Sequence, residues 1–214
     1  MNSINIKPNS NLNLYGYQNF FLKFIELYKN EKLPNKILFS GQKGIGKSTL
    51  AYHITNYIFS QNEENKYNLN LFEISNQNKS FKLIQNNTHP NFHLIDILDE
   101  KKSIEISQIR EMLNYANKSS FNNQEKIILI DNIEKLNLNS LNALLKIVEE
   151  PNDNIIFFLI FDNSKNISDT LKSRCIKFNL FLNSNECIDI ANKILKDDIR
   201  NLISKELINY YVTP

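Results

Sequence analysis

The sequence predicts an α/β fold in which helices cover both faces of a five-stranded parallel sheet, giving three layers. Five short runs that are apolar throughout alternate with segments whose apolar residues recur at helical spacing. This alternation is expected when parallel strands are buried on both faces. The chain has 214 residues, of which 42% are hydrophobic. That length allows one full domain, expected over 1–182, and the beginning of a smaller helical unit over 183–214.

The first half of the chain is predicted to form two helices and two strands. The first helix has apolar residues at helical spacing and is stopped by Pro34. The stretch 60–80 is rich in Asn, Glu, Gln and Lys, which predicts an irregular excursion. In chain order, the predicted elements are a helix over 17–33, a strand over 36–40, a helix over 48–59 and a strand over 92–98.

The second half continues the same alternation of helix and strand. Pro151 closes the helix that precedes the most apolar strand, and the segment 183–211 has helical spacing. The predicted elements are a helix over 104–116, a strand over 126–131, a helix over 139–150, a strand over 155–161, a short helix over 167–172 and a strand over 175–180.

The segment 41–48 reads GQKGIGKS and matches the phosphate-binding pattern G-x-x-x-x-G-K-[ST] between a predicted strand and a predicted helix. Its glycines let backbone N–H groups converge on an anion, and the following helix directs the positive end of its dipole at the same phosphates. Lys47 supplies a charge for the outer phosphates, and Ser48 supplies a hydroxyl for Mg²⁺. A glycine-rich turn that binds nothing and a relic loop without turnover stay open as alternatives. The predicted nucleotide-binding residues are Gly41, Gly44, Ile45, Gly46, Lys47, Ser48 and Thr49.

A carboxylate is predicted beside this loop. The apolar run 126–130 leads into Asp131 at the carboxyl edge of the sheet, where Asp131 would meet the Mg²⁺ ion beside Ser48. An ordinary strand-end Asp that caps a turn is the alternative. The next residue, Asn132, carries an amide that cannot take up the proton transferred in general-base catalysis, and Glu134 is expected to point elsewhere. These residues predict a site equipped to bind nucleotide and poorly equipped to cleave it.

Composition and charge weigh against several other classes of protein. The net charge of +2 and the pI of about 8.4 are too mild to indicate nucleic-acid binding by themselves. Two cysteines are too few for a disulfide framework or a zinc site without helpers, and the pair His89 and His93 is interrupted by Pro90. No apolar run is long enough to span a bilayer, so we expect a cytoplasmic protein without membrane contact.

Four blocks of sequence resemble the clamp-loader branch of the AAA+ ATPases, which are P-loop NTPases. The resemblance extends over about 14–182 and implies a AAA+ domain followed by the beginning of a helical lid at 183. The rest of the lid and the collar domain that joins the subunits are expected to lie outside this sequence. The blocks are 38–51 (LFSGQKGIGKSTLA), 89–92 (HPNF), 142–151 (NALLKIVEEP) and 173–175 (SRC).

The resemblance also implies cofactors and a residue that acts on another subunit. ATP and Mg²⁺ are the implied cofactors. Zinc is not, because the four-cysteine module of many clamp-loader subunits would fall within 52–88, which contains no Cys. Arg174 matches the arginine finger that reaches into a neighbour's ATP site, where a planar, always-charged guanidinium suits developing phosphate charge. A surface Arg in a salt bridge is the alternative for Arg174.

The implied function is that of a clamp-loader subunit in the bacterial DNA polymerase III holoenzyme, supporting ATP-dependent loading of the sliding clamp onto primed DNA. The implied partners are gamma/tau-like and delta-like loader subunits and, through them, the clamp and the DNA. Hydrolysing relatives usually carry Glu where this chain has Asn132, so weak hydrolysis is expected. An ATP-hydrolysing motor subunit of the gamma/tau type is the alternative. Gly16 falls where this superfamily packs the adenine, although a simple turn glycine is equally compatible with the sequence.

Overall fold

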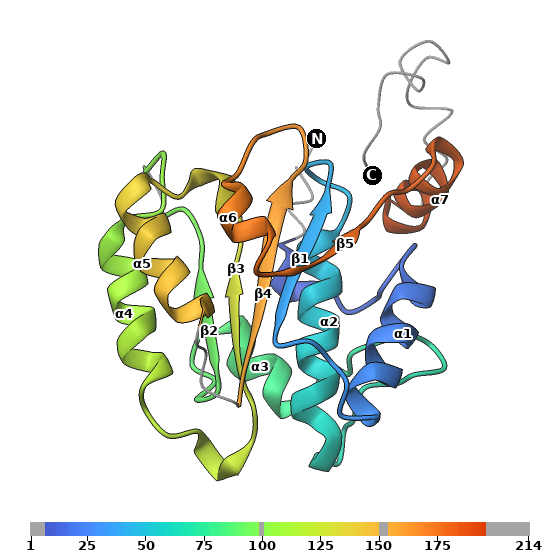
Figure 1. Cartoon of the computed structure of the whole chain (residues 1–214). Helices are drawn as coiled ribbons and strands as arrows, with labels where there is room; N and C mark the ends of the chain where they lie inside the picture. The colour runs from blue at the N-terminus through green and yellow to red at the C-terminus, as the bar shows by residue number, and fades with distance from the viewer. Residues whose placement is uncertain (1–6, 99–100, 150–153, 196–214) are drawn as a thin grey trace.

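The computed structural model describes residues 7–98, 101–149 and 154–195. Within these ranges, five parallel strands form one sheet in the spatial order β2-β3-β4-β1-β5 (Figure 1). The strands are β1 (Lys36–Gly41), β2 (Phe92–Ile95), β3 (Lys126–Ile130), β4 (Ile155–Asp162) and β5 (Ile176–Asn179). The predicted five-stranded parallel sheet is therefore confirmed.

Helices cover both faces of this sheet, which gives the three predicted layers (Figure 1). One face is covered by α1 (Gln18–Lys29), α2 (Lys47–Phe59) and α3 (Lys79–Gln85). The opposite face is covered by α4 (Ile106–Ala116), α5 (Leu138–Glu149) and the short α6 (Asp169–Lys172). After β5, α7 (Ser184–Leu195) packs against the first layer through Cys187 and Ile190.

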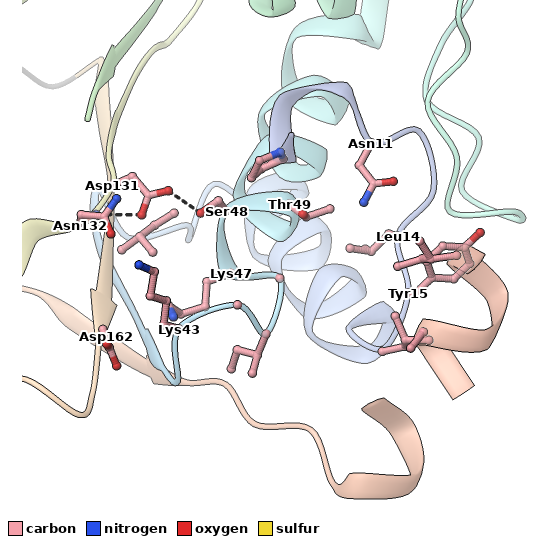
Figure 2. Close-up of a pocket in the computed structure, with 18 of the residues that line it drawn as sticks. Asn11, Leu14, Tyr15, Lys43, Lys47, Ser48, Thr49, Asp131, Asn132 and Asp162 are labelled. Carbon is pink, nitrogen blue, oxygen red and sulfur yellow. Dashed lines mark hydrogen bonds between the residues drawn. The ribbon is translucent and has the colours of Figure 1, made fainter. Parts of the chain in front are cut away.

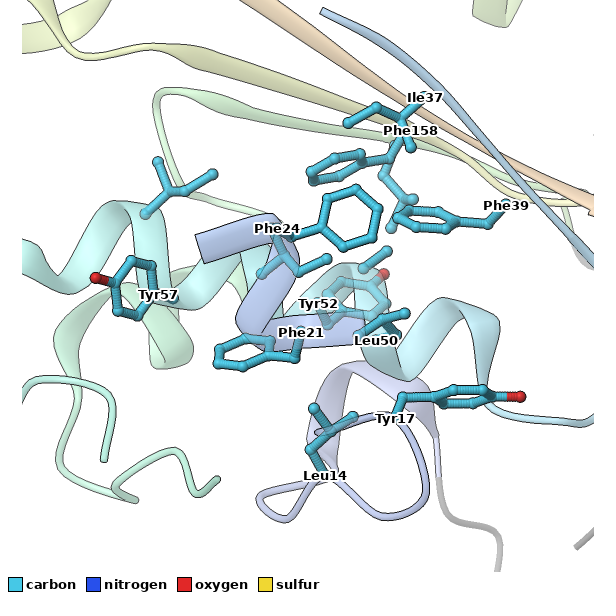
Figure 3. Close-up of a cluster of buried hydrophobic side chains, with 14 of the residues drawn as sticks. Leu14, Tyr17, Phe21, Phe24, Ile37, Phe39, Leu50, Tyr52, Tyr57 and Phe158 are labelled. Carbon is cyan, nitrogen blue, oxygen red and sulfur yellow. The ribbon is translucent and has the colours of Figure 1, made fainter. Parts of the chain in front are cut away.

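The three central strands, β3, β4 and β1, are largely apolar and buried because each face of the sheet has its own core, whereas β5 at the edge is mostly exposed. Phe158 of β4 faces α1 and α2, where it lies beside Phe39 of β1, and Phe39 in turn packs edge-on against Phe24 of α1 (Figure 3). Its neighbour Phe157 points to the opposite core, where it joins Val148 of α5. Fully burying each such side chain is worth about 1.5–3 kcal/mol. Adjacent residues therefore stabilise opposite layers.

The chain path places the functional site at the carboxyl edge of the sheet. Leaving β1, the chain enters α2 on one face, whereas leaving β3 it enters α5 on the other. In open α/β sheets, ligands bind beyond the carboxyl ends of strands where the chain departs to opposite faces. Residue Gly41 of β1 is in register with Asp162 of β4, so the end of β4 lies beside the start of the glycine loop.

The prediction missed α3, which lies at the end of the stretch expected to be irregular. Its first turn is capped by groups from elsewhere in the chain: the Glu63 carboxylate accepts the backbone N–H groups of Lys79 (2.9 Å) and Ser80 (3.0 Å). The Asn78 side chain accepts the N–H of Phe81 at 2.7 Å and also accepts from Asn56 of α2. Buried asparagine contacts and a distant Glu thus order a segment whose composition suggested a loop.

Other boundaries differ by a few residues. The predicted strand over 92–98 ends at Ile95, and beyond it the Asp96 side chain accepts the N–H of Ile97 at 2.7 Å. The predicted helix over 183–211 is seen as α7, and its part beyond 195 lies outside the described residues. In the described ranges, no helix combines the length and the apolar character needed to cross a membrane.

Candidate nucleotide-binding site

A cavity of about 590 Å³ opens at the carboxyl edge of the sheet, within the usual size range of ligand pockets (Figure 2). Its walls come from the segment before α1, the glycine loop with the first turn of α2, the ends of β3 and β4, and α7. Among the predicted site residues, those that line it are Gly44, Ile45, Gly46, Lys47, Ser48, Thr49 and Asp131. Segments far apart in sequence therefore converge on the predicted phosphate loop.

The glycines of the loop meet two different backbone requirements. Gly44 and Gly46 have φ of +89° and +88°, which side chains with a Cβ rarely adopt. Gly41 does not line the cavity, but a Cβ there would lie 2.5 Å from the carbonyl oxygen of Leu180. That carbonyl is held close because the N–H of Leu180 donates to Ser40 O at 2.7 Å. Gly41 thus allows the end of β5 to pass close to the loop, whereas Gly44 and Gly46 allow the loop backbone to adopt its positive φ angles.

Lys47 is buried within the loop that it follows. Its Nζ donates to the carbonyl oxygens of Gly41 (2.9 Å) and Gln42 (2.5 Å), so the ammonium lies at the mouth of the loop (Figure 2). Burial lowers the pKa of Lys47, and the nearby carboxylates of Asp131, Asp162 and Glu134 oppose that shift. A charge held among carbonyls and carboxylates at this point is suited to phosphate oxygens.

Ser48 and Asp131 meet as the sequence predicted. The Ser48 hydroxyl donates to Asp131 Oδ2 at 2.5 Å, and the backbone N–H of Asn132 donates to Oδ1 at 2.8 Å (Figure 2). Burial raises the pKa of Asp131, and the hydrogen bond from Ser48 opposes the shift. The pair offers a hydroxyl and a carboxylate oxygen side by side, the hard oxygen donors that Mg²⁺ prefers, so the residues present fit this ion.

Asn132 adopts a left-handed backbone conformation, with φ of +54° and ψ of +46°. Its side chain is held by Asp96 at the end of β2, because Nδ2 donates to Asp96 Oδ1 at 2.7 Å. The residue after the strand-end Asp is therefore a neutral amide engaged by a neighbouring carboxylate. This position has no group that could act as a general base toward a water at the phosphates.

Glu134 corrects one expectation from the sequence. The left-handed turn at Asn132 leads directly into the 3₁₀ turn η4 (Ile133–Lys135), and this turn brings Glu134 to the cavity wall. Its Oε2 accepts the backbone N–H of Asp162 at 3.3 Å. The expectation that Glu134 points elsewhere was wrong because it assumed a turn without the reversal at Asn132. Asp162, the last residue of β4, also lines the cavity.

The other end of the cavity lies between the N-terminal segment and α7. Tyr15 and Ile190 line it, and Lys193 Nζ lies 5.9 Å from the centre of the Tyr15 ring. Gly16 has φ of +81°, and a Cβ there would lie 2.7 Å from Ile190 Cδ1 and 2.9 Å from Leu182 Cδ2. Gly16 therefore serves both a turn and the close approach of α7. The contribution of α7 carries no local sequence signal, because its apolar stripe is that of any amphipathic helix.

Arg174 lies outside the cavity lining, in the turn between α6 and β5. Its Nη1 donates to the carbonyl oxygen of Thr170 at 2.8 Å, and its Nη2 forms an ion pair with Glu149 Oε1 at 2.5 Å. The side chain is about one-third exposed. Both the predicted finger and the alternative surface ion pair are compatible with this geometry, because a finger that acts on a neighbour is not expected in its own cavity.

The histidines are structural in the part of the chain that the structure describes. His89 stacks on Phe59 with ring centroids 4.1 Å apart, and His53 is fully buried between Tyr67 and Asn11. Among the described residues, no group of three or more His, Cys, Asp or Glu side chains is arranged to hold a metal ion. Glu63 accepts hydrogen bonds from the backbone N–H and the hydroxyl of Ser80, and the Asn78 side chain accepts the N–H of Phe81, so polar contacts order this part of the chain.

Comparison with known proteins gives the family and the fold. A family model described as "DNA polymerase III, delta subunit" matches residues 16–184. The DNA polymerase III subunit delta' of Buchnera aphidicola subsp. Schizaphis graminum is 32% identical over 187 residues, covering 86% of this chain and 55% of that protein. DNA polymerase III subunit gamma of the same organism is 31% identical over 178 residues, covering 82% and 46%.

Solved structures bear on the fold alone. The RuvB Holliday junction branch migration motor of Thermotoga maritima superposes with a TM-score of 0.52 at 18% identity, covering 89% of this chain and 56% of that one. The predicted α/β fold with a five-stranded parallel sheet covered by helices is thereby confirmed. The chain spans about half the length of the curated relatives it matches. Because the family model matches most of it, the chain belongs to the DNA polymerase III delta-subunit family, and its relatives named delta' agree with the clamp-loader resemblance of its sequence.

Proposed function

We propose that this chain is a clamp-loader subunit that binds ATP with Mg²⁺, hydrolyses it poorly and donates Arg174 to the nucleotide site of a neighbouring subunit. The observation that carries the proposal is the combination of a complete phosphate loop with Asn132 directly after Asp131. Holding a nucleotide requires the loop, Lys47 and an ion site. Cleaving it requires in addition a base or water-orienting group, and Asn132 is engaged by Asp96.

The residues of this chain divide the binding task. The N–H groups of the glycine loop and the start of α2 would surround the phosphates, and Lys47 would exchange its carbonyl partners for phosphate oxygens. Ser48 and Asp131 would hold Mg²⁺, which supplies charge neutralisation between the outer phosphates. Tyr15 and the α7 side chain of Ile190 would enclose the base end of the cavity. In this arrangement, the AAA+ domain would extend over 1–182, and α7 would form the beginning of the lid over 183–214.

The proposed partners follow from the names of the relatives. Relatives named delta' and gamma match the same part of the chain, which supports a place among the subunits of one loader. Through that assembly, the chain would act on the sliding clamp and primed DNA. A role in replication also suggests the cytoplasm as its location.

A motor subunit of the gamma/tau type is the second candidate, and Glu134 is the observation that favours it. Its carboxylate lines the same cavity as Lys47 and Asp131, so a carboxylate is present near the phosphate loop although not at position 132. The gamma relative at 31% identity points the same way. We prefer the first candidate because Glu134 accepts the backbone N–H of Asp162 and is thereby held at the end of β4.

The test is steady-state ATP hydrolysis by a loader assembled from the full chain with the gamma/tau-like and delta-like subunits of its own organism. Arg174→Ala is expected to reduce hydrolysis by the assembly 10-fold or more, by analogy with the large contribution of arginine fingers, without weakening ATP binding to this chain. The matched control is Arg110→Ala, on the exposed side of α4. Unchanged hydrolysis with Arg174→Ala would contradict the proposed role of Arg174.

A further inference from the structure

We propose that Glu149 is a positioning residue for Arg174, holding its guanidinium in the orientation from which it reaches a neighbouring subunit. This inference rests on the proposed role of Arg174 as an arginine finger. It adds Glu149 as a second residue on which the action of Arg174 depends.

The geometry fixes the guanidinium plane from two sides. Glu149 is the last residue of α5, and Arg174 lies 25 residues later in the turn after α6. The Nη2 atom donates to Glu149 Oε1 at 2.5 Å, and Nη1 donates to Thr170 O at 2.8 Å. Two acceptors from two different helices, each on its own terminal nitrogen, define both the direction and the rotation of a planar group. Among the described residues, no further partner is found for the remaining N–H donors of the fork, which can meet another acceptor.

Position 149 is an unfavourable place for a carboxylate by itself. It ends α5, where the helix dipole disfavours negative charge. The carboxylate therefore gains its favourable interaction from the guanidinium rather than from its own helix. The pair is exposed, with 34% of the Arg174 side chain and 47% of the Glu149 side chain accessible, and exposed ion pairs contribute little to stability. Orientation of Arg174 is the effect that such a contact can supply.

The presence of Arg rather than Lys at position 174 agrees with a need for a side chain held in one orientation. The chain has 25 basic residues, of which only Arg110, Arg174 and Arg200 are arginines. A lysine ammonium would satisfy a simple surface ion pair equally well. It has no rigid fork, so it could not be held in one orientation by Glu149 and Thr170 O while presenting a further donor outward.

The experiment uses the assembled loader with the full chain carrying Glu149→Gln, which keeps the size of the side chain and removes its charge. The matched control is Asp169→Asn, which breaks the neighbouring ion pair with Lys172 in α6 and leaves the partners of Arg174 in place. We expect Glu149→Gln to lower kcat for ATP about three- to tenfold, since partial loss of orientation costs less than loss of the finger. KM for ATP, complex assembly and the melting temperature of the chain are expected to stay unchanged, as are all four quantities in the control.

A second comparison separates positioning from structure. In the Arg174→Ala background, Glu149→Gln is expected to cause no further loss, because both changes act through the same guanidinium. Three results would overturn the inference: unchanged kcat with Glu149→Gln while Arg174→Ala lowers it, a rise in kcat, or an additive loss in the double variant. Unchanged kcat with Arg174→Ala itself would instead contradict the proposed function, so the two failures are distinguishable.

Discussion

Ser48 and Asp131 lie 83 residues apart in the sequence, and the Ser48 hydroxyl donates a hydrogen bond of 2.5 Å to Asp131 Oδ2. Ser48 lies in the first turn of α2 on one face of the sheet, and Asp131 follows β3, after which the chain departs to the opposite face. Their contact joins the glycine loop to the end of β3. It also places side by side the two oxygen donors that we propose as ligands for Mg²⁺.

The first prediction concerns this pair. Asp131→Asn retains an oxygen that accepts from Ser48 but removes the negative charge, so the affinity for ATP in the presence of Mg²⁺ is expected to fall about tenfold. Affinity measured in EDTA is expected to change little. Titration calorimetry under both conditions measures the difference, with Asp169→Asn as the exposed control. Equal losses with and without Mg²⁺ would show that Asp131 does not act through the ion.

The second prediction concerns Asn132. The side chain at this position is directed to Asp96 Oδ1, so a carboxylate introduced by Asn132→Glu would meet a like charge. We expect Asn132→Glu to leave steady-state ATP hydrolysis by the isolated chain within about threefold of the wild-type rate. The neutral variant Asn132→Gln controls for the change in size. Position 132 lines the cavity, so a rise of more than about tenfold would mean that a carboxylate there can serve the phosphates despite the nearby charge of Asp96.

The sequence was sufficient for the sheet, for the setting of the glycine loop between β1 and α2 and for the contact between Ser48 and Asp131, because each depends on a strong local pattern or on strand order. It was not sufficient for Glu134, whose place depends on one left-handed residue, Asn132, and Asn residues are too common in this chain to signal such a turn. It also missed α3, because the caps of that helix come from Glu63 and from the buried contact between Asn56 and Asn78.

The third prediction tests the junction between α7 and the N-terminal segment. Gly16→Ala places a Cβ at φ of +81° and against the ends of Ile190 and Leu182. The expected loss of stability is about 1–2 kcal/mol, set chiefly by the backbone conformation. Denaturant unfolding measures it. In the control Asn87→Gly, also at positive φ (55°), stability is not expected to fall by that amount. Full stability of Gly16→Ala would contradict the strained backbone conformation described for this glycine.

The fourth prediction is a loss of stability in mild acid. Burial lowers the pKa of His53 and of His89 from 6.5 to about 4, so the unfolded chain binds these protons more readily than the folded chain. The stabilising effect of the neutral histidines is present above pH 6.5 and is lost as the pH falls from 6.5 towards 4. Each is expected to account for about 2 kcal/mol between pH 7 and pH 5. Urea unfolding at the two pH values measures the sum, and equal free energies of unfolding would contradict it.

The most direct test of the central claim is calorimetric titration of ATP with Mg²⁺ into the full chain and into Lys47→Ala. We expect the wild-type chain to bind one ATP with micromolar affinity and Lys47→Ala to weaken binding about 30-fold or more, because the buried charge at the loop is lost. Circular dichroism confirms that the variant is folded. A folded wild-type chain that binds no ATP, or binds it as tightly as folded Lys47→Ala, would contradict the claim that this loop holds nucleotide.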